Sequence, residues 1–386
     1  MFTLSKKLKS LPPYLFLEID KAKRIARAEG RDIIDLGIGD PDQPTPEYII
    51  EALYQAAKGP STHRYALDQG MPALRRSIEG WYKRRFNVDL DPEREILPLI
   101  GSKEGIAHFP LAFINNGDYS LIPDPSYPPY KGGTILAGGK PYSLPLLESN
   151  GFLPDLKKVP LNIRRKARLI YINYPNNPTG ATAEKDFYRE VIDFAKKNKI
   201  IVISDLAYSE MAYDGYKPSS VLEVEGAKEV TLEFHSLSKT YNMTGWRIGW
   251  ACGNQSLVAA LAKAKSNIDS GIFSAIQLAG IAALEGPKRD IGKMQSLYQQ
   301  RRDILVEGLR SLGWQARPPK ATFYLWVRIP KKTDSIAFAS WLLKKADIVA
   351  TPGVGFGKYG EGYLRMALTV PGERLKEAIN RLKKIS

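Results

Sequence analysis

The stretch "RLIYINYPNNPTGATAEKDFYREVIDFAKKNKIIVISD" (168–205) holds two short apolar runs on either side of an amphipathic segment. The runs 168–175 and 199–205 predict buried strands, because nearly continuous apolar runs of this length are typical of parallel sheets covered on both faces. The segment between them, 183–199, has the period of a helix that covers a sheet. Its apolar residues near one face are Phe187, Val191, Ile192, Phe194 and Ala195. The stretch therefore predicts an α/β fold.

Other apolar runs of the same kind extend this sheet. They are "ILPLIG" (96–101), "YSLIPD" (119–124) and "EVTLEFHS" (229–236). Upstream of them, residues 45–59 predict a helix with Thr45 as its cap, Pro46 in its first turn and Gly59 at its end. No internal repeat is present.

The carboxy-terminal third has a different pattern, which predicts a separate, smaller α+β unit. Its expected elements are a helix from about 287 to 312, a strand in "ATFYLWVRI" (321–329), a helix in "SIAFASWLLKKA" (335–346), a strand in "GYLRMALT" (362–369) and a closing helix in "GERLKEAINRLKKI" (372–385). The first 40 or so residues have no clear sheet of their own. We therefore expect an amino-terminal segment, 1–45, that joins the small domain, a large domain, 46–285, and a small domain, 286–386.

The charge of the chain carries little information about its partners. There are 56 Lys and Arg against 41 Asp and Glu, a net charge of +15, over 386 residues. The basic residues are scattered, with no stripe interleaved with aromatics and no nucleic-acid-binding motif, so we expect solvated helix faces rather than a nucleic-acid surface.

Cysteine, histidine and hydropathy limit the possible classes further. Cys252 is the one cysteine, which suits a reducing compartment, and the three histidines, His63, His108 and His235, are not spaced like zinc ligands. The amino terminus lacks an apolar run of signal-peptide length, and nowhere do about 18 apolar residues follow one another. We expect a cytoplasmic protein with no metal site and no membrane segment.

Polar residues follow four of the predicted strands, at the position where open parallel sheets bind ligands. Ser102 and Lys103 come after the first strand and open an expected helix, whose N–H groups suit a phosphate; an ordinary turn explains them equally well. The loop "NYPNNPTG" (173–180) exposes side-chain amides. Asp205, three residues before Tyr208, ends a strongly apolar run and is either a helix cap or a buried ionic partner.

The last of these strand ends is "SLSKTYNMTGWRIG" (236–249). Lys239 can attack a carbonyl to form a Schiff base if its surroundings favour the neutral amine. With Ser236 and Arg247 it would suit a ligand that bears an aldehyde and a phosphate. A single lysine is far more often a solvated surface group, but four successive strand ends with polar residues favour a site.

Taken together, these motifs resemble those of the class I/II aminotransferases, pyridoxal-phosphate (PLP) enzymes of fold type I. The resemblance covers nearly the whole chain and rests on "NNPTG", the Asp205–Tyr208 pair, "SLSKTYNMTGWRIG" and "YLRMALT", in the family's order. It implies a large, mainly parallel seven-stranded sheet domain covered by helices, a smaller α+β domain, PLP as cofactor, an amino acid and a 2-oxo acid as substrates, and a homodimer with shared active sites.

A narrower similarity is to the LL-diaminopimelate aminotransferases. It rests on "LGIGDPDQPTP", "GSKEGIAH", "IPDPSYPPY" and "FHSLSKTYNMTGWRIGW". It implies LL-diaminopimelate and 2-oxoglutarate as the substrate pair and a place in lysine biosynthesis. Aspartate, alanine or aromatic aminotransferases of the same fold are the nearest alternative. A PLP-dependent C–S lyase and a non-enzymatic regulator with an added DNA-binding segment are more distant ones.

The resemblance assigns roles around the cofactor ring. Lys239 would hold the cofactor covalently and then move the proton of the substrate Cα. Asp205 would pair with the pyridine nitrogen and keep it protonated. Tyr208 and Asn177 would bond to the phenolic oxygen. Tyr127 would stack on the ring, although a packed turn aromatic is the alternative.

It also assigns the phosphate and the substrate. The phosphate ligands would be Ser102, Lys103, Ser236 and Arg247, with Tyr65 reaching the site of the partner subunit. Arg365, in mid-strand, would bind the substrate α-carboxylate, unless it forms an internal ion pair. Other expected substrate contacts are Tyr14, Gly39, Lys103, Tyr127 and Asn177. The glycine-rich stretch 353–360 does not match a P-loop and predicts a mobile connection before the Arg365 strand.

Overall fold

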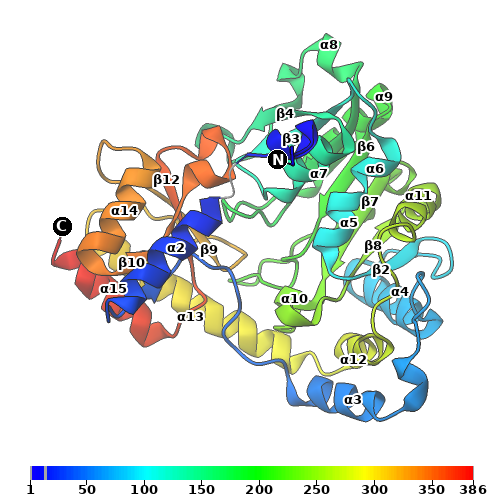
Figure 1. The fold of residues 1–386 in the computed structure, drawn as a ribbon, viewed down its shortest axis with the longest axis horizontal. Helices are drawn as coiled ribbons and strands as arrows, with labels where there is room; N and C mark the ends of the chain where they lie inside the picture. The colour runs from blue at the N-terminus through cyan, green and yellow to red at the C-terminus, as the bar shows by residue number, and fades with distance from the viewer. Residues whose placement is uncertain (1, 13–14, 386) are drawn as a thin grey trace.

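A seven-stranded sheet forms the centre of the larger lobe in the computed structural model, which describes residues 2–12 and 15–385. Its strands, in spatial order, are β2 (Ile96–Leu99), β8 (Gly249–Gly253), β7 (Thr231–Ser236), β6 (Ile201–Asp205), β5 (Ala167–Ile172), β3 (Tyr119–Asp124) and β4 (Lys140–Pro145). The strands from β7 to β4 run parallel, and β8 is antiparallel to both β7 and β2. The predicted α/β fold with a mainly parallel sheet is confirmed (Figure 1).

Two strands of this sheet lacked a recognisable pattern in the sequence. β4, "KPYSLP", is an edge strand with two prolines, which are tolerated there because one side of an edge strand has no partner to donate to. β8, "GWACG", is short and bounded by glycines, so it lacks the β-branched residues of its neighbours. Both strands are held by pairing with their neighbours rather than by local preference.

Helices cover both faces of the sheet. They are α3 (Glu47–Ala57), α4 (Pro72–Phe86), α5 (Ser102–His108), α6 (Pro110–Phe113), α7 (Pro129–Ala137), α8 (Leu161–Arg164), α9 (Lys185–Asn198), α10 (Leu237–Thr240), α11 (Gln255–Lys265) and α12 (Ser274–Glu285). Successive residues of β5 alternate between two apolar clusters: Ile170 packs with residues of α4 and α9, and Tyr171 with residues of α5 and α11. Because both faces are buried, these strands read as continuous apolar runs.

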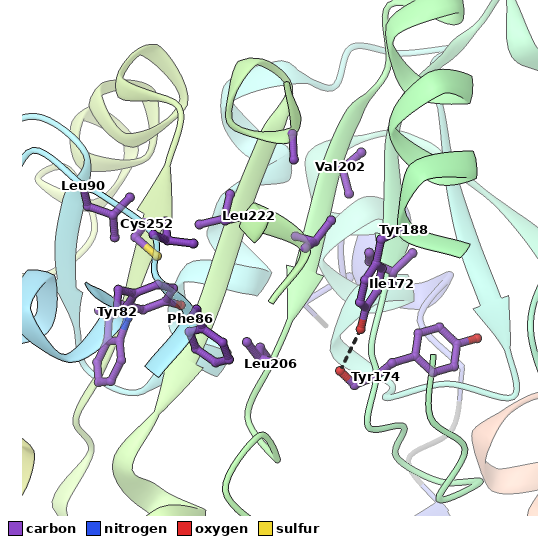
Figure 2. Packing of buried hydrophobic residues seen from close by; sticks show 14 of the residues in the cluster. Tyr82, Phe86, Leu90, Ile172, Tyr174, Tyr188, Val202, Leu206, Leu222 and Cys252 are labelled. Atoms are coloured by element: carbon purple, nitrogen blue, oxygen red, sulfur yellow. Dashed lines mark hydrogen bonds between the residues drawn. The ribbon is translucent and has the colours of Figure 1, made fainter. Parts of the chain in front are cut away.

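The helix between β5 and β6 forms as its pattern predicts. α9 buries Phe187, Val191, Ile192 and Ala195 against the sheet. Figure 2 shows Tyr188 of the same helix beside Ile172, with its hydroxyl donating to the Tyr174 carbonyl oxygen at 3.4 Å. The predicted cap of α3 is wrong: Pro46 takes the cap position without a side-chain bond, and the Thr45 hydroxyl donates to the Asn242 carbonyl oxygen at 3.0 Å.

The smaller lobe has its own sheet and core. The sheet order is β11 (Thr351–Pro352), β12 (Tyr363–Ala367) and β9 (Tyr324–Arg328), all antiparallel, flanked by α14 (Ser335–Ala346) and α15 (Gly372–Lys383). The long helix α13 (Arg289–Ser311) runs from this lobe towards α12 of the larger one (Figure 1). These elements match the predicted pattern of the carboxy-terminal third.

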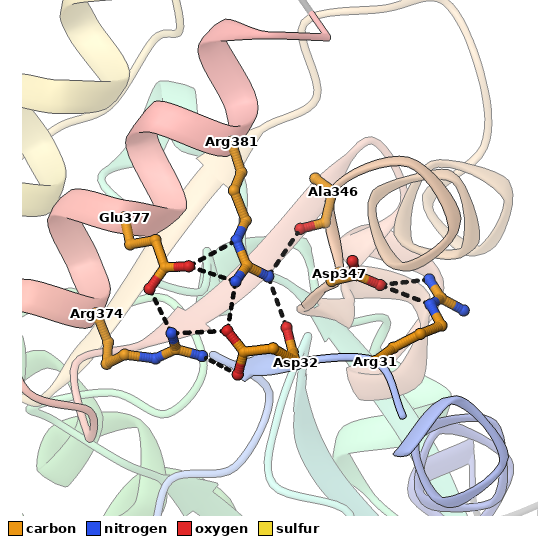
Figure 3. A network of polar contacts seen from close by, with 7 residues as sticks. All are labelled: Arg31, Asp32, Ala346, Asp347, Arg374, Glu377 and Arg381. Atoms are coloured by element: carbon orange, nitrogen blue, oxygen red, sulfur yellow. Dashed lines mark hydrogen bonds and ion pairs between the residues drawn. The ribbon is translucent and has the colours of Figure 1, made fainter. Parts of the chain in front are cut away.

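Most of the amino-terminal segment attaches to the smaller lobe. α2 (Leu15–Ala28), which the sequence pattern did not reveal, packs there, and β1 (Ile34–Asp35) pairs in parallel with β10 (Ile348–Val349). The first helix, α1 (Lys6–Lys9), lies instead against α7 of the larger lobe (Figure 1). Figure 3 shows the polar contacts at this junction. The Asp32 carboxylate bonds to Arg374 at 2.7 Å and to Arg381 of the same helix, and Arg31 binds Asp347. The Asp32 side chain is 63% exposed, so we expect its contacts to fix orientation more than stability.

Candidate active site

A cavity of about 350 Å³ opens at the carboxyl ends of the central strands, between the two lobes. That volume is in the range of small-molecule and cofactor sites. Predicted site residues that line it are Gly39, Ser102, Lys103, Tyr127, Asn177, Asp205, Tyr208, Ser236, Lys239, Arg247 and Arg365. Side chains separated by hundreds of residues thus converge where parallel sheets place ligands.

Lys239 follows β7 in the short helix α10, and its Nζ donates to the Gly39 carbonyl oxygen at 3.0 Å. Burial lowers the pKa of this amine to about 8; Asp40 opposes the shift, and the nearby charges of Arg365 and Arg247 add to it. A lysine in water has a pKa of about 10.4. Near neutral pH, Lys239 therefore has a far larger share of the neutral, nucleophilic amine than a surface lysine.

The rate at which cofactor-free protein forms a borohydride-reducible linkage with PLP should rise with pH through about 8. The sign follows from the lone pair: the protonated amine cannot attack an aldehyde, and the fraction of neutral amine grows as pH passes the pKa. The measurement is the initial rate of incorporation between pH 6 and 10, with Lys239→Met as the blank. A rate that keeps rising to pH 10 or above would contradict the depressed pKa.

Asp205 ends β6 with one carboxylate oxygen engaged and one not. Oδ2 accepts a hydrogen bond from the Tyr130 hydroxyl at 2.7 Å, while Oδ1 is buried with no hydrogen-bond partner among the residues that the structure describes. Burial raises the pKa of this carboxyl to about 6, against the opposing hydrogen bonds from Tyr130 and the Ala207 backbone. Asp205 forms no helix cap and pairs with no cation among the described residues, so of the two predicted roles, that of a buried ionic partner would need a ligand.

The surroundings of Asp205 Oδ1 show whether the cavity suits PLP. A carboxylate in an apolar wall is costly unless a donor reaches it, and a protonated pyridine nitrogen is a cationic donor of the right kind. The Tyr130 hydroxyl fixes the other oxygen, so the orientation of the group does not depend on the ligand. The residues present fit the cofactor.

Arg365 lies in β12 and reaches the cavity from the smaller lobe. Its Nη1 donates to Asn177 Oδ1 at 2.9 Å and its Nη2 to the Gly37 carbonyl oxygen at 2.8 Å. The guanidinium carbon lies 4.2 Å from the ring centroid of Tyr324 and 4.6 Å from that of Phe356. The two aromatic rings orient the guanidinium and keep water away from it. Its positive charge is therefore available to bind a carboxylate.

Aromatic residues close the remaining wall. The Tyr208 hydroxyl donates to the Tyr324 hydroxyl at 3.3 Å, and burial raises the pKa of Tyr208 well above its usual range. A Cβ at Gly39 would lie 1.9 Å from the Tyr324 hydroxyl oxygen, so only glycine allows this close approach. Tyr127 meets Tyr130 edge to face, with ring centroids 5.7 Å apart.

Positive charge and hydroxyls gather at one end of the cavity. Ser102 and Lys103 open α5, and Ser236, which ends β7, lines the cavity beside Arg247. Gly101 precedes α5 with φ +76°, and a Cβ there would lie 2.3 Å from an Arg247 guanidinium nitrogen. Glycine thus makes room for the arginine, and this end suits a phosphate.

Of the predicted site residues, Tyr65 lies apart from this cavity, and Tyr14 is not placed. Tyr65 is 97% exposed and is not in the cavity wall. Tyr14 falls outside the described residues. The predicted roles of both stay predictions.

Sequence reasoning missed several residues that line or support the cavity. Tyr130 is in the quoted "PDPSYPPY", but the pattern does not reveal which of its tyrosines faces Asp205. Asn173 directly follows β5; its Nδ2 donates to the Asp205 carbonyl oxygen at 2.7 Å and its Oδ1 accepts from the Asn177 N–H at 2.8 Å. Its position at a strand end was the available signal. No sequence signal marked Tyr324 and Phe356, because both reach the cavity only through the packing of the smaller lobe.

Comparisons with known proteins agree on one family. The sequence matches the family "Aminotransferase class I and II" over residues 31–382. It is 56% identical to an LL-diaminopimelate aminotransferase of Syntrophobacter fumaroxidans, covering 100% of this chain and 99% of that one, and 53% identical to one of Aquifex aeolicus, covering 100% of both.

Solved structures give the same result. Substrate-bound BacF from Bacillus subtilis superposes with a TM-score of 0.96 at 37% identity, covering 100% of this chain and 98% of that chain. A mutant aspartate aminotransferase from Thermus thermophilus superposes with a TM-score of 0.94 at 28% identity, covering 100% of both chains. None of the helices in the described part of the chain is long and apolar enough to span a membrane.

Proposed function

Because the chain belongs to the class I and II aminotransferases, which are PLP-dependent enzymes, we propose that it transfers the amino group of LL-diaminopimelate to 2-oxoglutarate in lysine biosynthesis. The family predicted from the motifs is confirmed. The observation that carries the substrate assignment is the 51–56% identity, over essentially the full length, to relatives named for that activity.

PLP, when bound, supplies an electron sink that makes the proton on the substrate α-carbon acidic. In our proposal, Lys239 holds the cofactor at rest and then takes that proton on its Nζ. Asp205 Oδ1 accepts the pyridine N–H and keeps the nitrogen protonated. Asn177 and Tyr208 would hydrogen-bond the phenolic oxygen, Tyr127 would cover the ring, and Ser102, Lys103, Ser236 and Arg247 would hold the phosphate.

On the substrate side, Arg365 binds the α-carboxylate. Its guanidinium is already oriented by the Gly37 carbonyl and the Asn177 amide oxygen, so little side-chain freedom is lost when substrate binds. The amino group of the first substrate stays on the enzyme until an oxo acid enters the same site, which gives ping-pong kinetics. Gly39 and Lys103, with the undescribed Tyr14, are the proposed distal contacts.

We further propose a cytoplasmic enzyme with the domain bounds 1–45, 46–285 and 286–386. The single thiol, Cys252, is buried and unpaired, which suits a reducing compartment. The bounds are supported by an apolar cluster in each lobe, although Ala207, Tyr208, Met211 and Tyr213 of the larger lobe join the cluster of the smaller one, and by the attachment of β1 to β10.

The enzyme is also proposed to be a homodimer in which Tyr65 completes the partner's phosphate site. Its support is the full exposure of an aromatic side chain beside Leu67, which is 67% exposed. Mixing inactive Tyr65→Ala and Lys239→Ala subunits should then restore up to about a quarter of the wild-type activity, since half of randomly paired dimers are hybrids and each hybrid has one intact site. If Tyr65 served its own subunit, no hybrid site would be intact and activity would not return.

The test of substrate identity is a half-reaction. LL-diaminopimelate added to PLP-loaded protein without any oxo acid should convert the cofactor to the pyridoxamine form, and 2-oxoglutarate should reverse the change. Conversion by aspartate, alanine or an aromatic amino acid alone would keep the aminotransferase and replace the substrate. Release of pyruvate and ammonia without an acceptor would instead indicate a C–S lyase.

A further inference from the structure

A buried charged cluster lies behind the phosphate end of the cavity. Lys265, at the end of α11, is fully buried, and its Nζ contacts Glu104 Oε1 at 3.4 Å, the Asp269 carboxylate and the Ser270 carbonyl oxygen at 2.8 Å. Glu104, His108 and Asp269 have ligand atoms within 4.8 Å of one another. The ammonium of Lys265 already supplies the positive charge for these carboxylates, so the arrangement is an ion-pair network rather than a cation site.

The Glu104 carboxylate also holds the turn that leads into α5. Its Oε2 accepts a hydrogen bond from the Ile100 N–H at 2.6 Å, while Oε1 faces Lys265. Ile100 and Gly101 are followed by Ser102 and Lys103, which line the proposed phosphate end of the cavity. A carboxylate can accept at both oxygens, so one side chain bonds to a backbone donor and pairs with an ammonium at once.

The other end of the network reaches the segment that carries Tyr65. Lys265 holds the loop at Asp269 and Ser270, and the next residue, Gly271, packs directly on backbone: a Cβ there would lie 2.3 Å from the Leu67 carbonyl oxygen and 2.9 Å from that of Ala66. The phosphate turn and the Tyr65 segment are therefore connected through buried charges, with the Glu104–Lys265 pair on the side of the turn.

We propose that Glu104 and Lys265 are positioning residues, which fix the turn Ile100–Lys103 relative to the Ala66–Leu67 backbone and thereby shape the phosphate-binding end of the site. Neither side chain lines the cavity. The inference rests on the proposed placement of the PLP phosphate at Ser102, and it adds residues that act on the phosphate only through the backbone.

The variant that tests this is Glu104→Gln. A glutamine offers one acceptor and one donor, so it cannot serve both Ile100 and Lys265. The matched control is Glu95→Gln: Glu95 Oε2 likewise accepts from a backbone N–H four residues earlier, at Asp91, at 2.8 Å and pairs with Lys228 at 3.0 Å, but Glu95 lies outside the cavity wall. The probes are PLP and pyridoxal, which lacks the phosphate, titrated into cofactor-free protein.

Glu104→Gln should weaken PLP binding by about tenfold or more and leave pyridoxal binding nearly unchanged, so the affinity ratio of the two falls. Glu95→Gln should keep the wild-type ratio. Equal weakening of both probes would show general destabilisation, and tighter PLP binding would show that the carboxylate acts through its negative charge; either result overturns the proposal. If wild-type protein itself binds pyridoxal as tightly as PLP, the result contradicts the proposed phosphate site at Ser102 rather than the role of Glu104.

Lys265→Met provides a second test if Glu104→Gln does not fold, because it removes the other half of the pair. It should lower the same affinity ratio. When both variants fold, the double variant should lose no more than the larger single loss, since the two residues act through one contact. Additive losses would mean that the residues act separately and would overturn the proposed link.

Discussion

Lys239→Ala is expected to abolish covalent attachment of PLP and to lower kcat by at least about 10³-fold, because one amine both holds the cofactor and moves the proton at the substrate α-carbon. The measurements are the absorbance band of the lysine-bound cofactor, borohydride reduction followed by peptide mapping, and steady-state turnover. PLP should still bind without a covalent link, since the phosphate and ring contacts remain.

Lys23→Ala is the control for this result. Lys23 is also a buried lysine, paired with Asp35 at 3.0 Å, but it lies outside the cavity wall. Its loss should lower stability and leave the cofactor band in place. A reducible linkage that persists in Lys239→Ala would show that a different lysine holds the cofactor.

Asp205→Asn should separate activity from stability. An amide cannot keep the pyridine nitrogen protonated, so kcat should fall by at least about 10²-fold with a much smaller change in KM. The cofactor-free protein should meanwhile gain up to about 3 kcal/mol at pH 7, because the buried carboxylate no longer has to ionise.

The pH dependence fixes the sign of that gain. The pKa of Asp205 is raised from 3.8 to about 6, so the folded state binds the proton more tightly than the unfolded chain. Wild-type stability therefore declines as pH rises from about 4 through 6, and the advantage of the asparagine variant is present above that window and absent below it. Chemical denaturation of both cofactor-free proteins at pH 4 and pH 7 measures it.

Glu233→Gln serves as the matched buried carboxylate. Glu233 lies on the neighbouring strand, burial raises its pKa to about 7, and its oxygens accept from Ser204, Ser220 and Tyr82. It does not line the cavity. This variant should change stability without a comparable loss of kcat. An equal loss of kcat in both variants would mean that the Asp205 effect is structural.

How far the sequence predicts this molecule depends on the range of the interactions involved. β5, β6 and α9 follow from local apolar runs and periodicity, because both faces of the sheet are buried and nearly all residues of these strands pack; Arg168 in β5 is the exposed exception. β4 and β8 depend on their neighbours, and α2 has its first residues in a stretch with no clear pattern. The Thr45 cap failed because a tertiary bond to Asn242 competes for the same hydroxyl.

The candidate site divides in the same way. Lys239, Asp205 and Arg247 stand at strand ends or in motifs, and the cavity brings them together. Tyr324 and Phe356 belong to the smaller lobe, and their place beside Arg365 is set by the docking of that lobe. The glycine-rich stretch 353–360, predicted as a connection, contains Phe356, which lines the cavity beside Arg365. No local pattern contains that information, because it arises from contacts between distant segments.

The pairing of β1 with β10 has a consequence for how the chain is made. All residues of the seven-stranded sheet, with Lys239 and Asp205, have been synthesised once Gly253 has left the ribosome. Ile34 can pair with Ile348, and the Gly37 carbonyl can accept from Arg365, only after the last part of the chain has been made. Such distant contacts form late in synthesis. A nascent chain thus carries its reactive amine without the arginine that would hold an amino acid beside it, and transamination begins only when translation has nearly ended.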